Sequence, residues 1–327
     1  MTDRIDLMRQ WLESLGYMDY ELSIASEDAS FRQYYRIKHN GLTFIIMDAP
    51  PEREDCRPYI NVSDMLLQGG LNVPRIINSD LEKGFLLLTD LGETLYLDIL
   101  SDDNVDELYH DAIEALLKIQ GNVQAQGLPP FDTKLLQNEM DLFGDWLLDK
   151  HLDLVLDKTE HESLRKIFSL LVSNAQQQPQ CFVHRDYHSR NLLWSEENNP
   201  GILDFQDAVC GPLVYDLVSL LKDCYIKWPR ERIIGWIEHF YARCTIGNVE
   251  LEDFIRWFDL MGVQRQLKAS GIFARLWHRD GKPGYLKDIP RTLSYISDLE
   301  GRYPEFEPLI DMIRKRVLPG LDKVAPG

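Results

Sequence analysis

Two short polar stretches constrain this 327-residue chain more than any other feature. The first is HRDYHSRN, residues 184–191, and the second is DFQD, residues 204–207. Apolar runs flank them: CFV precedes the first stretch, LLW follows it, and GIL precedes the second. Short apolar runs bounded by turn residues are typical of buried strands. The pattern therefore predicts polar side chains held by short strands in a hairpin-like scaffold.

The spacing of these polar residues is typical of phosphoryl-transfer sites. Asp186 has the position of a carboxylate that orients an accepting hydroxyl, and Asn191 follows five residues later, where a metal ligand is expected. Asp204 has the position of the aspartate that binds magnesium in a DFG-type segment. We therefore predict Asp186 as the catalytic residue, Asn191 and Asp204 as Mg²⁺ ligands, and ATP as the phosphoryl donor. The choice between ATP and GTP stays open.

Four further residues in or near these two stretches have expected roles besides catalysis and metal binding. His184 is expected to be a core histidine, and His188 either approaches the substrate or makes a structural hydrogen bond. Asp207 is expected to support the metal site or to cap the following turn. Asp216 is expected to brace the catalytic loop.

The N-terminal part of the chain is expected to be rich in strands. Residues 22–52 alternate extended segments with turns. Asn40-Gly41 gives a hairpin signal, because both residues tolerate the positive φ of tight hairpins. A helix is expected over residues 59–70, and a strand pair within residues 73–92.

From Glu93 onward, long stretches of helical periodicity dominate. This change predicts an α+β fold with two lobes, a small β-rich N-lobe and a larger helical C-lobe. We place the lobes at residues 1–91 and 92–327, with a nucleotide-binding sheet in the first and the catalytic loop and substrate site in the second. A cleft between lobes is a common place for ligands. Phe273 and Trp277 are expected to lie in the core.

The composition excludes several classes of protein. Apolar residues at 44% and charged residues at 27% are typical of a folded soluble chain. A net charge of -18 argues against a nucleic-acid partner, which requires a basic face. Neither a membrane span nor a secretion signal is expected, since no long apolar run occurs. Five cysteines without CxxC spacing favour reduced thiols, and we expect a cytoplasmic protein without membrane partners.

Several stretches carry a resemblance to a known family. The chain resembles the aminoglycoside and choline phosphotransferase superfamily of kinase-like proteins, whose signature is HxDxHxxN followed by an aspartate-rich magnesium segment. It is similar in particular to a bacterial branch, the anomeric kinases of N-acetylmuramate and N-acetylglucosamine in cell-wall recycling. The stretches that resemble this branch are MDAPPE (47–52), GFLLLTDLG (84–92), HRDYHSRNLLW (184–194), GILDFQDAVCGPLVYDL (201–217) and QLKASGIFARLWHRDGK (266–282).

The resemblance implies a protein-kinase-like fold and transfer of the ATP γ-phosphoryl group to the C1 hydroxyl of an amino sugar. It also implies a sugar 1-phosphate product and a functional link to a downstream nucleotidyltransferase. Adenine is expected to meet backbone groups near Asp90 and Leu91. Two alternatives stay open: another small acceptor, such as an aminoglycoside or a choline-like molecule, and a nucleotide-binding pseudokinase scaffold.

The acceptor is expected to be small and anionic. Only eleven residues separate Asp204 from Asp216, which leaves no room for the platform on which protein kinases bind peptides. Residues 261–287 carry six basic residues against one acid, Asp280, and arginine binds carboxylates well. For any single basic residue, a solvated surface position explains the charge equally well. The candidate substrate contacts are His188, Arg265, Lys268, Arg275 and Arg279.

Two features of protein kinases are missing. No GxGxxG loop occurs, and Met47 occupies the position of the strand lysine that binds phosphates. The helix expected over residues 59–70 correspondingly has no glutamate to pair with such a lysine. Since the phosphates still need cationic support, Arg32 and Arg36 are the candidates, with Ser30 as a hydroxyl contact.

Overall fold

The computed structural model forms two compact units. Unit 1 combines Met1–Ile99 with Arg190–Asp207, and unit 2 combines Leu100–Ser189 with Ala208–Gly327. The bounds of unit 1 therefore differ from those of the expected first lobe, residues 1–91. The structure describes residues 3–27, 31–245 and 247–324.

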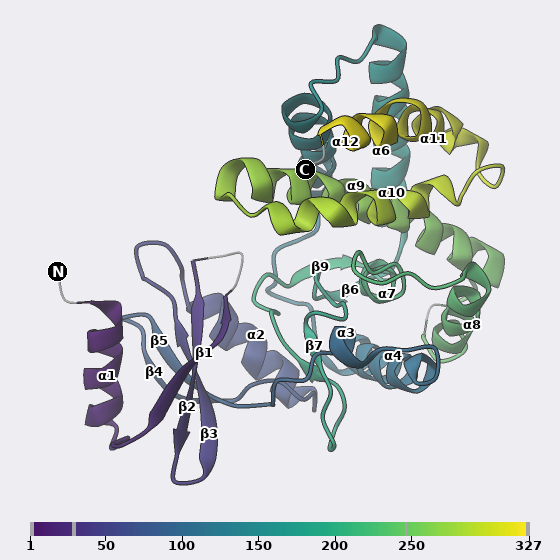
Figure 1. Cartoon of the computed structure of the whole chain (residues 1–327). Helices are drawn as coiled ribbons and strands as arrows, with labels where there is room; N and C mark the ends of the chain where they lie inside the picture. Colours follow the sequence, from purple (N-terminus) through teal and green to yellow (C-terminus); the bar gives the residue numbers. More distant parts are fainter. Residues whose placement is uncertain (1–2, 28–30, 246, 325–327) are drawn as a thin grey trace. The chain divides into compact units, whose positions relative to one another are not determined.

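Unit 1 is built on a five-stranded antiparallel sheet in the order β1-β2-β3-β5-β4, and a two-stranded hairpin, β7-β8, is added from the later segment. Figure 1 shows the helices α1 and α2 on opposite sides of the sheet. The strands are β1 (Glu21–Glu27), β2 (Gln33–His39), β3 (Leu42–Asp48), β4 (Ile76–Asp80), β5 (Phe85–Thr89), β7 (Leu192–Leu193) and β8 (Gly201–Ile202). The helices are α1 (Arg4–Ser14), α2 (Arg57–Gln68) and α3 (Tyr96–Ile99).

The local signals in the N-terminal part are confirmed. β2 and β3 form the expected hairpin, and Asn40 and Gly41 at its turn both have positive φ, 51° and 79°. The expected strand pair is β4-β5. The expected helix is α2, and Gly70, just beyond its end, has a φ of 78°, which favours glycine.

One face of the sheet is covered by α1. Met8, Trp11 and Leu12 on this helix pack against buried sheet residues such as Ile37 and Phe85. Because side chains alternate across a strand, the intervening sheet residues face the other way, toward the side on which α2 lies (Figure 1). The strand β5 is thus buried on both faces within unit 1, because Phe85, Leu86, Leu87 and Leu88 are all buried, whereas β1 and β4 are largely exposed.

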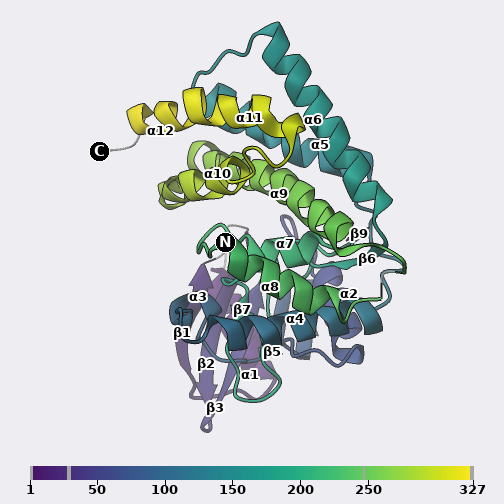
Figure 2. The same cartoon turned by 90° about the vertical axis from the view of Figure 1, so that its right-hand side faces the viewer.

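Unit 2 is mostly helical, and its short strands β6 and β9 pair with each other. Figure 2 shows the long helix α9 running beside α5, α6 and α10, and α9 also packs against α7 and α8. The elements before α9 are α4 (Val105–Asn122), α5 (Thr133–Leu142), the π-helix η1 (Phe143–His151), α6 (Lys158–Gln177), β6 (Gln180–Val183), β9 (Val209–Pro212), α7 (Tyr215–Leu221) and α8 (Arg230–Tyr241). The others are α9 (Leu251–Asp280), the 3₁₀ helix η2 (Pro283–Asp288), α10 (Ile289–Ser297), the 3₁₀ helix η3 (Pro304–Phe306), α11 (Glu307–Met312), the π-helix η4 (Ile313–Val317) and α12 (Leu318–Val324).

The helix α9 is the central element of unit 2. Phe273 on α9 is buried, as expected, but the expectation that Trp277 lies in the core is wrong, because 37% of Trp277 is exposed. The reason is position: the last turn of α9 lies at the surface, and the helix ends at Gly281 in the left-handed conformation. Among the residues that the structure describes, no helix is long and apolar enough to cross a membrane.

Candidate active site

The segment HRDYHSRN, which carries the expected catalytic residue Asp186, begins directly after β6, in unit 2. Its start is fixed by Asp216 on α7, whose carboxylate accepts hydrogen bonds from the backbone N–H groups of His184 (2.6 Å) and Arg185 (2.9 Å). Arg185 has a φ of 78°, which is uncommon for a residue with a side chain. Burial raises the pKa of Asp216 to about 7, although the two backbone donors oppose this rise. Asp216 thus holds the strained start of the segment.

His184 and Tyr187 are the buried anchors of the segment. His184 is fully buried, and its Nδ1 accepts a hydrogen bond from the backbone N–H of Asp186 at 3.3 Å. The hydroxyl of Tyr187 donates to the backbone oxygen of Ala112 on α4. The backbone at Asp186 is therefore held on either side by a buried side chain, His184 before it and Tyr187 after it.

Asp186 lies among cations. Its Oδ1 is 4.0 Å from an Nη atom of Arg265 on α9, and its side chain is 40% exposed. The protein atoms around Asp186 displace water, and this effect alone would raise its pKa. The positive charges of Lys268, His188 and Arg265 outweigh it, so the pKa of Asp186 lies well below the ordinary value of an aspartate. Asp186 is therefore a carboxylate throughout the neutral range and a weak base.

A buried glutamate that the sequence analysis missed pairs with two of the cations around Asp186, Arg185 and Lys268. Glu139 on α5 pairs with Arg185 at 2.6 Å and with Lys268 at 3.2 Å, and Gln264 donates to it at 3.0 Å. Glu139 is 4% exposed, and the two cations hold its pKa below the ordinary value against the effect of burial. A signal was present, because Glu139 interrupts the apolar stripe of α5 between Leu136 and Met140, a position normally filled by a core residue.

The end of the segment within unit 2 is fixed by a second missed residue, Asp223. The backbone N–H and the hydroxyl of Ser189 both donate to Oδ2 of Asp223, and the N–H of Tyr225 donates to Oδ1 at 2.8 Å. Ser189 and Asp223 are fully buried. Asp216 and Asp223, both from the stretch around α7, thus hold the two ends of the segment.

The two expected metal ligands lie together in unit 1, at one end of the β7-β8 hairpin. Asn191 directly precedes β7 and Asp204 follows β8, and the N–H of Leu203 donates to the backbone oxygen of Asn191 at 2.9 Å. Asp204 has a φ of 61°, and Gln206 donates to its Oδ1 at 2.7 Å. An amide oxygen and a carboxylate at one hairpin end fit Mg²⁺, which binds one or two protein carboxylates together with nucleotide phosphates. No group of three or more His, Cys, Asp or Glu suited to a metal occurs among the described residues.

Arg32 supplies positive charge near this hairpin end. It is 9% exposed and donates to Glu54 at 2.9 Å. Burial would lower the pKa of Arg32, but the charges of Tyr34, Glu54 and Asp204, together with that of Asp207, raise it. Arg32 is therefore a charged guanidinium within electrostatic reach of Asp204, one of the two expected metal ligands. Asp207 itself is exposed, and Ser30 lies outside the described residues.

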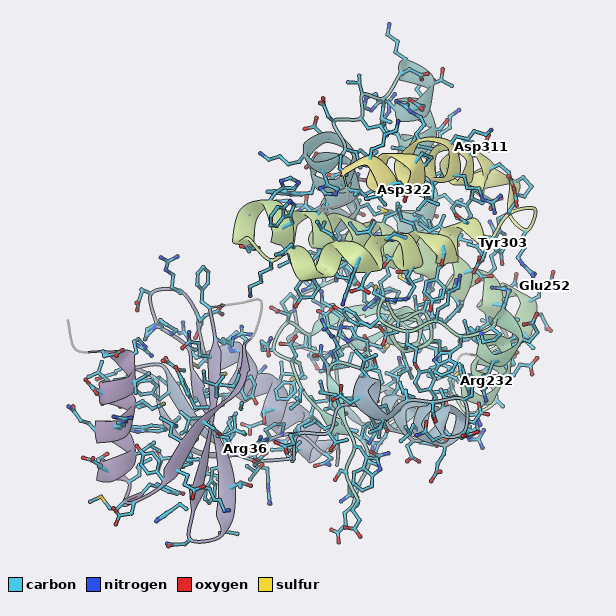
Figure 3. The ribbon with its side chains drawn as sticks, viewed as in Figure 1. Arg36, Arg232, Glu252, Tyr303, Asp311 and Asp322 are labelled. Atoms are coloured by element: carbon cyan, nitrogen blue, oxygen red, sulfur yellow. The ribbon has the colours of Figure 1, made fainter. Side chains whose placement is uncertain are left out.

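Arg36, the other expected phosphate contact, lies on β2 of unit 1, where Figure 3 labels it, and other residues of unit 1 bind its side chain. It donates to both carboxylate oxygens of Asp90, at 2.6 and 3.0 Å, to Glu93 at 2.8 Å and to the backbone oxygen of Gly92 at 2.9 Å. These bonds tie β2 to the segment after β5, where Leu91 is half-buried. Arg36 therefore has a structural task, and Arg32 is the better candidate for the phosphates.

The expected substrate contacts on α9 fall into three environments. Arg265 and Lys268 are buried beside Asp186, at 4% and 6% exposure. Arg275 is half-buried, and its Nε is buried without a hydrogen-bond partner among the described residues. Arg279 is exposed and pairs with its neighbour Asp280 at 2.9 Å.

A row of aromatic rings extends from the segment HRDYHSRN in unit 2. The ring of His188 lies 5.5 Å from that of Tyr225, Tyr225 lies 6.1 Å from Phe273 on α9, and Phe273 stacks on Tyr285 of η2 at 5.7 Å. His188, Tyr225 and Tyr285 are half-buried. Their partly open rings give an amphipathic wall next to Asp186.

Residues 21–257 match the family described as "Phosphotransferase enzyme family". Since this match spans more than half of the chain, the chain belongs to that family, and the expected membership is confirmed. It is 46% identical over 296 residues to a protein of Pseudomonas putida named N-acetylmuramate/N-acetylglucosamine kinase, covering 89% of this chain and 87% of the relative. A protein of Neisseria meningitidis with the same name is 34% identical over 316 residues, and the alignment covers 94% of this chain and 94% of that protein.

Solved structures of low sequence identity share the fold. The GDP complex of aminoglycoside 2'-phosphotransferase-IIIa superimposes with a TM-score of 0.63 at 17% identity, over 90% of this chain and 99% of the other. The choline kinase LicA from Streptococcus pneumoniae gives a TM-score of 0.63 at 11% identity, over 90% and 99%. The expected α+β, protein-kinase-like fold is confirmed.

Proposed function

We propose that this phosphotransferase is an ATP-dependent kinase of amino sugars that phosphorylates the anomeric C1 hydroxyl of N-acetylmuramate, N-acetylglucosamine or both. The name shared by the relatives, at 46% identity over most of both chains, supports the acceptor. The reaction class is supported mainly by Asp186. Its carboxylate is surrounded by cations, and hydrogen bonds hold its segment on either side of it.

In this mechanism Asp186 accepts a hydrogen bond from the sugar hydroxyl and orients its oxygen toward the γ-phosphorus. A bond forms between that oxygen and phosphorus while the bond from phosphorus to the departing ADP oxygen breaks, and the hydroxyl proton leaves through Asp186 to solvent. Because the transition state of phosphoryl transfer is loose, little base strength is required before the bond breaks. The low pKa of Asp186 suits an orienting role.

Asn191 and Asp204 would hold Mg²⁺, which would neutralise charge on the phosphates. Arg32 would add positive charge at the same end of the β7-β8 hairpin. Asp90 and Leu91 stay the predicted neighbours of adenine, and Asp207 stays a predicted support of the metal site.

Arg275 is the candidate for the lactyl carboxylate of N-acetylmuramate. It follows Lys268 by seven residues, so it lies on the same face of α9, two turns further along. Burial and the nearby Arg279 lower the pKa of Arg275, so an anion placed beside it would relieve an unfavourable charge. Arg279, paired with Asp280, serves as the matched comparison.

The test is an ADP-release assay with Mg-ATP and N-acetylmuramate, N-acetylglucosamine, choline or an aminoglycoside, with phosphorus NMR of any product. We expect a sugar 1-phosphate from the acetylated amino sugars, and a loss of turnover of roughly 10²- to 10⁴-fold in Asp186→Asn. If only choline or the aminoglycoside is phosphorylated, the amino-sugar assignment is wrong and that compound is the acceptor. If the protein binds the nucleotide but phosphorylates none of the compounds, a nucleotide-binding scaffold is favoured.

The same assay tests the carboxylate contact. Arg275→Met should raise the KM for N-acetylmuramate about 10-fold or more and leave the KM for N-acetylglucosamine nearly unchanged, because a charge-assisted hydrogen bond is lost only with the acidic sugar. Arg279→Met should affect neither. Equal losses with both sugars in Arg275→Met would contradict this role.

The product chemistry suggests the next step. A sugar 1-phosphate carries the group that a nucleotidyltransferase joins to a nucleotide, so we propose such an enzyme as the functional partner. A cytoplasmic location, where ATP is available, stays a prediction.

A further inference from the structure

Arg265 is a buried guanidinium whose hydrogen-bonding groups are mostly unused in unit 2. The residue is 4% exposed. One Nη atom donates weakly to the sulfur of Cys224 at 3.6 Å, and the other lies 4.0 Å from Oδ1 of Asp186. Its Nε is buried and has no hydrogen-bond partner among the described residues, and no oxygen of those residues accepts a hydrogen bond from Arg265.

Arg265 differs from Arg185 and Lys268, the other two cations beside Asp186, because each of those contacts a buried carboxylate. Arg185 and Lys268 contact the carboxylate of Glu139 at 2.6 and 3.2 Å, and Lys268 also meets the hydroxyl of Tyr215 at 3.0 Å. A buried arginine has five N–H donors, and buried polar groups are normally satisfied because unsatisfied ones are costly. If position 265 contributed only to packing, an apolar side chain there would stabilise the fold better than a buried charge.

The charge of Arg265 is nevertheless retained. Burial would lower its pKa, but Cys224, Tyr215 and Asp186 outweigh burial and raise it. The guanidinium is therefore a permanent donor that faces the carboxylate expected to orient the acceptor.

The separation between Arg265 and Asp186 is informative. At 4.0 Å, the nitrogen and the carboxylate oxygen are too far apart for a direct hydrogen bond. An oxygen atom placed between them can lie within about 3 Å of both, which is the geometry expected of a reacting atom held by two catalytic groups. A hydroxyl fits this position because it donates to the carboxylate and accepts from the guanidinium.

We propose that Arg265 is a second catalytic residue, which donates a hydrogen bond to the acceptor oxygen while that oxygen donates its hydrogen to Asp186. The two contacts fix the direction of the oxygen before phosphoryl transfer, and the positive charge stabilises the oxygen as its proton leaves. This inference rests on the proposed function only in taking the C1 hydroxyl of the sugar as the acceptor.

The test combines a change in the protein with a change in the sugar. Wild type, Arg265→Met and Arg256→Met are titrated, in the presence of Mg-ADP, with N-acetylglucosamine and with its 1-deoxy analogue, which lacks the acceptor hydroxyl. Arg256 lies on the same helix and pairs with Glu305, so it serves as the matched control. We expect wild type and Arg256→Met to bind the sugar more tightly than the analogue, and Arg265→Met to reduce this preference by roughly 10- to 100-fold or to abolish it.

Turnover gives the second readout. Arg265→Met should lower kcat for the sugar by about 10²-fold or more, the usual cost of removing one donor from a charge-stabilising site. If this variant does not fold, Arg265→Lys is measured instead, since it retains the charge and one donor but not the guanidinium fork. An unchanged preference for the hydroxyl in a folded variant of Arg265 would overturn the proposal, even where activity falls, because a merely structural arginine would not sense one hydroxyl.

The outcome for wild type separates the two proposals. If wild type phosphorylates the sugar but the preference for the hydroxyl survives in Arg265→Met, only the role of Arg265 fails. If wild type neither binds nor phosphorylates the sugar, the acceptor assignment fails, and the role of Arg265 toward that hydroxyl is rejected with it.

Discussion

At Asp186, the charge of one carboxylate is controlled by two residues distant in the sequence, Lys268 and Arg265, and by the neighbouring His188. Lys268, His188 and Arg265 surround it and hold its pKa well below the ordinary value of about 3.9. A group with a lowered pKa keeps its charge as the pH falls, and it is protonated only below the range in which an ordinary aspartate titrates. Protonation of Asp186 should therefore not limit activity in the mildly acidic range.

Lys268→Met tests this electrostatic arrangement. Removal of the cation with the largest effect on Asp186 should raise the pKa of Asp186, so the acid limb of the kcat/KM profile should move to higher pH than in wild type. Glu139 keeps Arg185 and Gln264 as partners, so the fold should survive. The measurement is kcat/KM over the acidic pH range.

Lys227→Met is the control for this experiment, since Lys227 is exposed and pairs with Asp298. Its acid limb should coincide with that of wild type. Coinciding limbs for Lys268→Met and wild type would mean that Lys268 does not control the protonation of Asp186.

Asp223→Ala should loosen the other end of the segment. The substitution leaves the buried N–H and hydroxyl of Ser189 without their acceptor, which costs about 1–3 kcal/mol per unsatisfied group. Asp223→Asn keeps an acceptor oxygen and should lose less. Urea denaturation of both variants measures the difference, and equal losses would show that the accepted hydrogen bonds are not the cause.

At the scale of elements, α9 determines how the site is assembled. It brings Arg265 and Lys268 to Asp186 and comes very close to the junction of α5 and η1 at Gly271. A Cβ atom at Gly271 would overlap the backbone of Leu142 and lie 2.6 Å from the nitrogen of Phe143. Because backbone cannot rotate away as a side chain can, the two helices would have to separate.

Gly271→Ala should therefore destabilise the protein by about 1–3 kcal/mol, the usual cost of overpacking, and lower kcat as α9 shifts. Gly235→Ala on α8 is the matched control, since a Cβ there meets no atom within 4 Å. The control should be slightly stabilising, by roughly 0.5–1 kcal/mol, because alanine favours helix over glycine. Thermal and urea unfolding test both, and an unaffected Gly271→Ala would show that the helices can separate without cost.

The elements also show what the sequence can and cannot reveal. The β2-β3 hairpin and the HRDYHSRN motif were predictable because their signals are local, a turn dipeptide and a fixed spacing. Glu139 and Asp223 were missed because their partners lie 46 and 34 residues away, and tertiary packing alone brings them together. On α9 the charges were visible, but only burial separates Arg265 from the exposed Arg279.

At the scale of the whole molecule, unit 1 is completed by a segment that the chain supplies about 90 residues after leaving it. The returning segment carries Leu192, Ile202 and Phe205, all fully buried, and Phe205 lies against Tyr59 of α2 at 4.8 Å between ring centroids. The side chain of Asn199 donates to the hydroxyl of Tyr96 at 2.8 Å. Residues 1–99 alone would thus lack part of their own core.

We expect a fragment of residues 1–99 to lack a cooperative thermal transition in circular dichroism. Loss of one buried phenylalanine side chain alone costs about 3–5 kcal/mol, which approaches the whole stability of many domains. The matched control is the same fragment joined through a flexible glycine-serine linker to residues 190–207, which restores Phe205 and the β7-β8 hairpin and should melt cooperatively. If both fragments melt alike, the sheet and its two helices suffice for folding, and the returning segment serves only to carry Asn191 and Asp204.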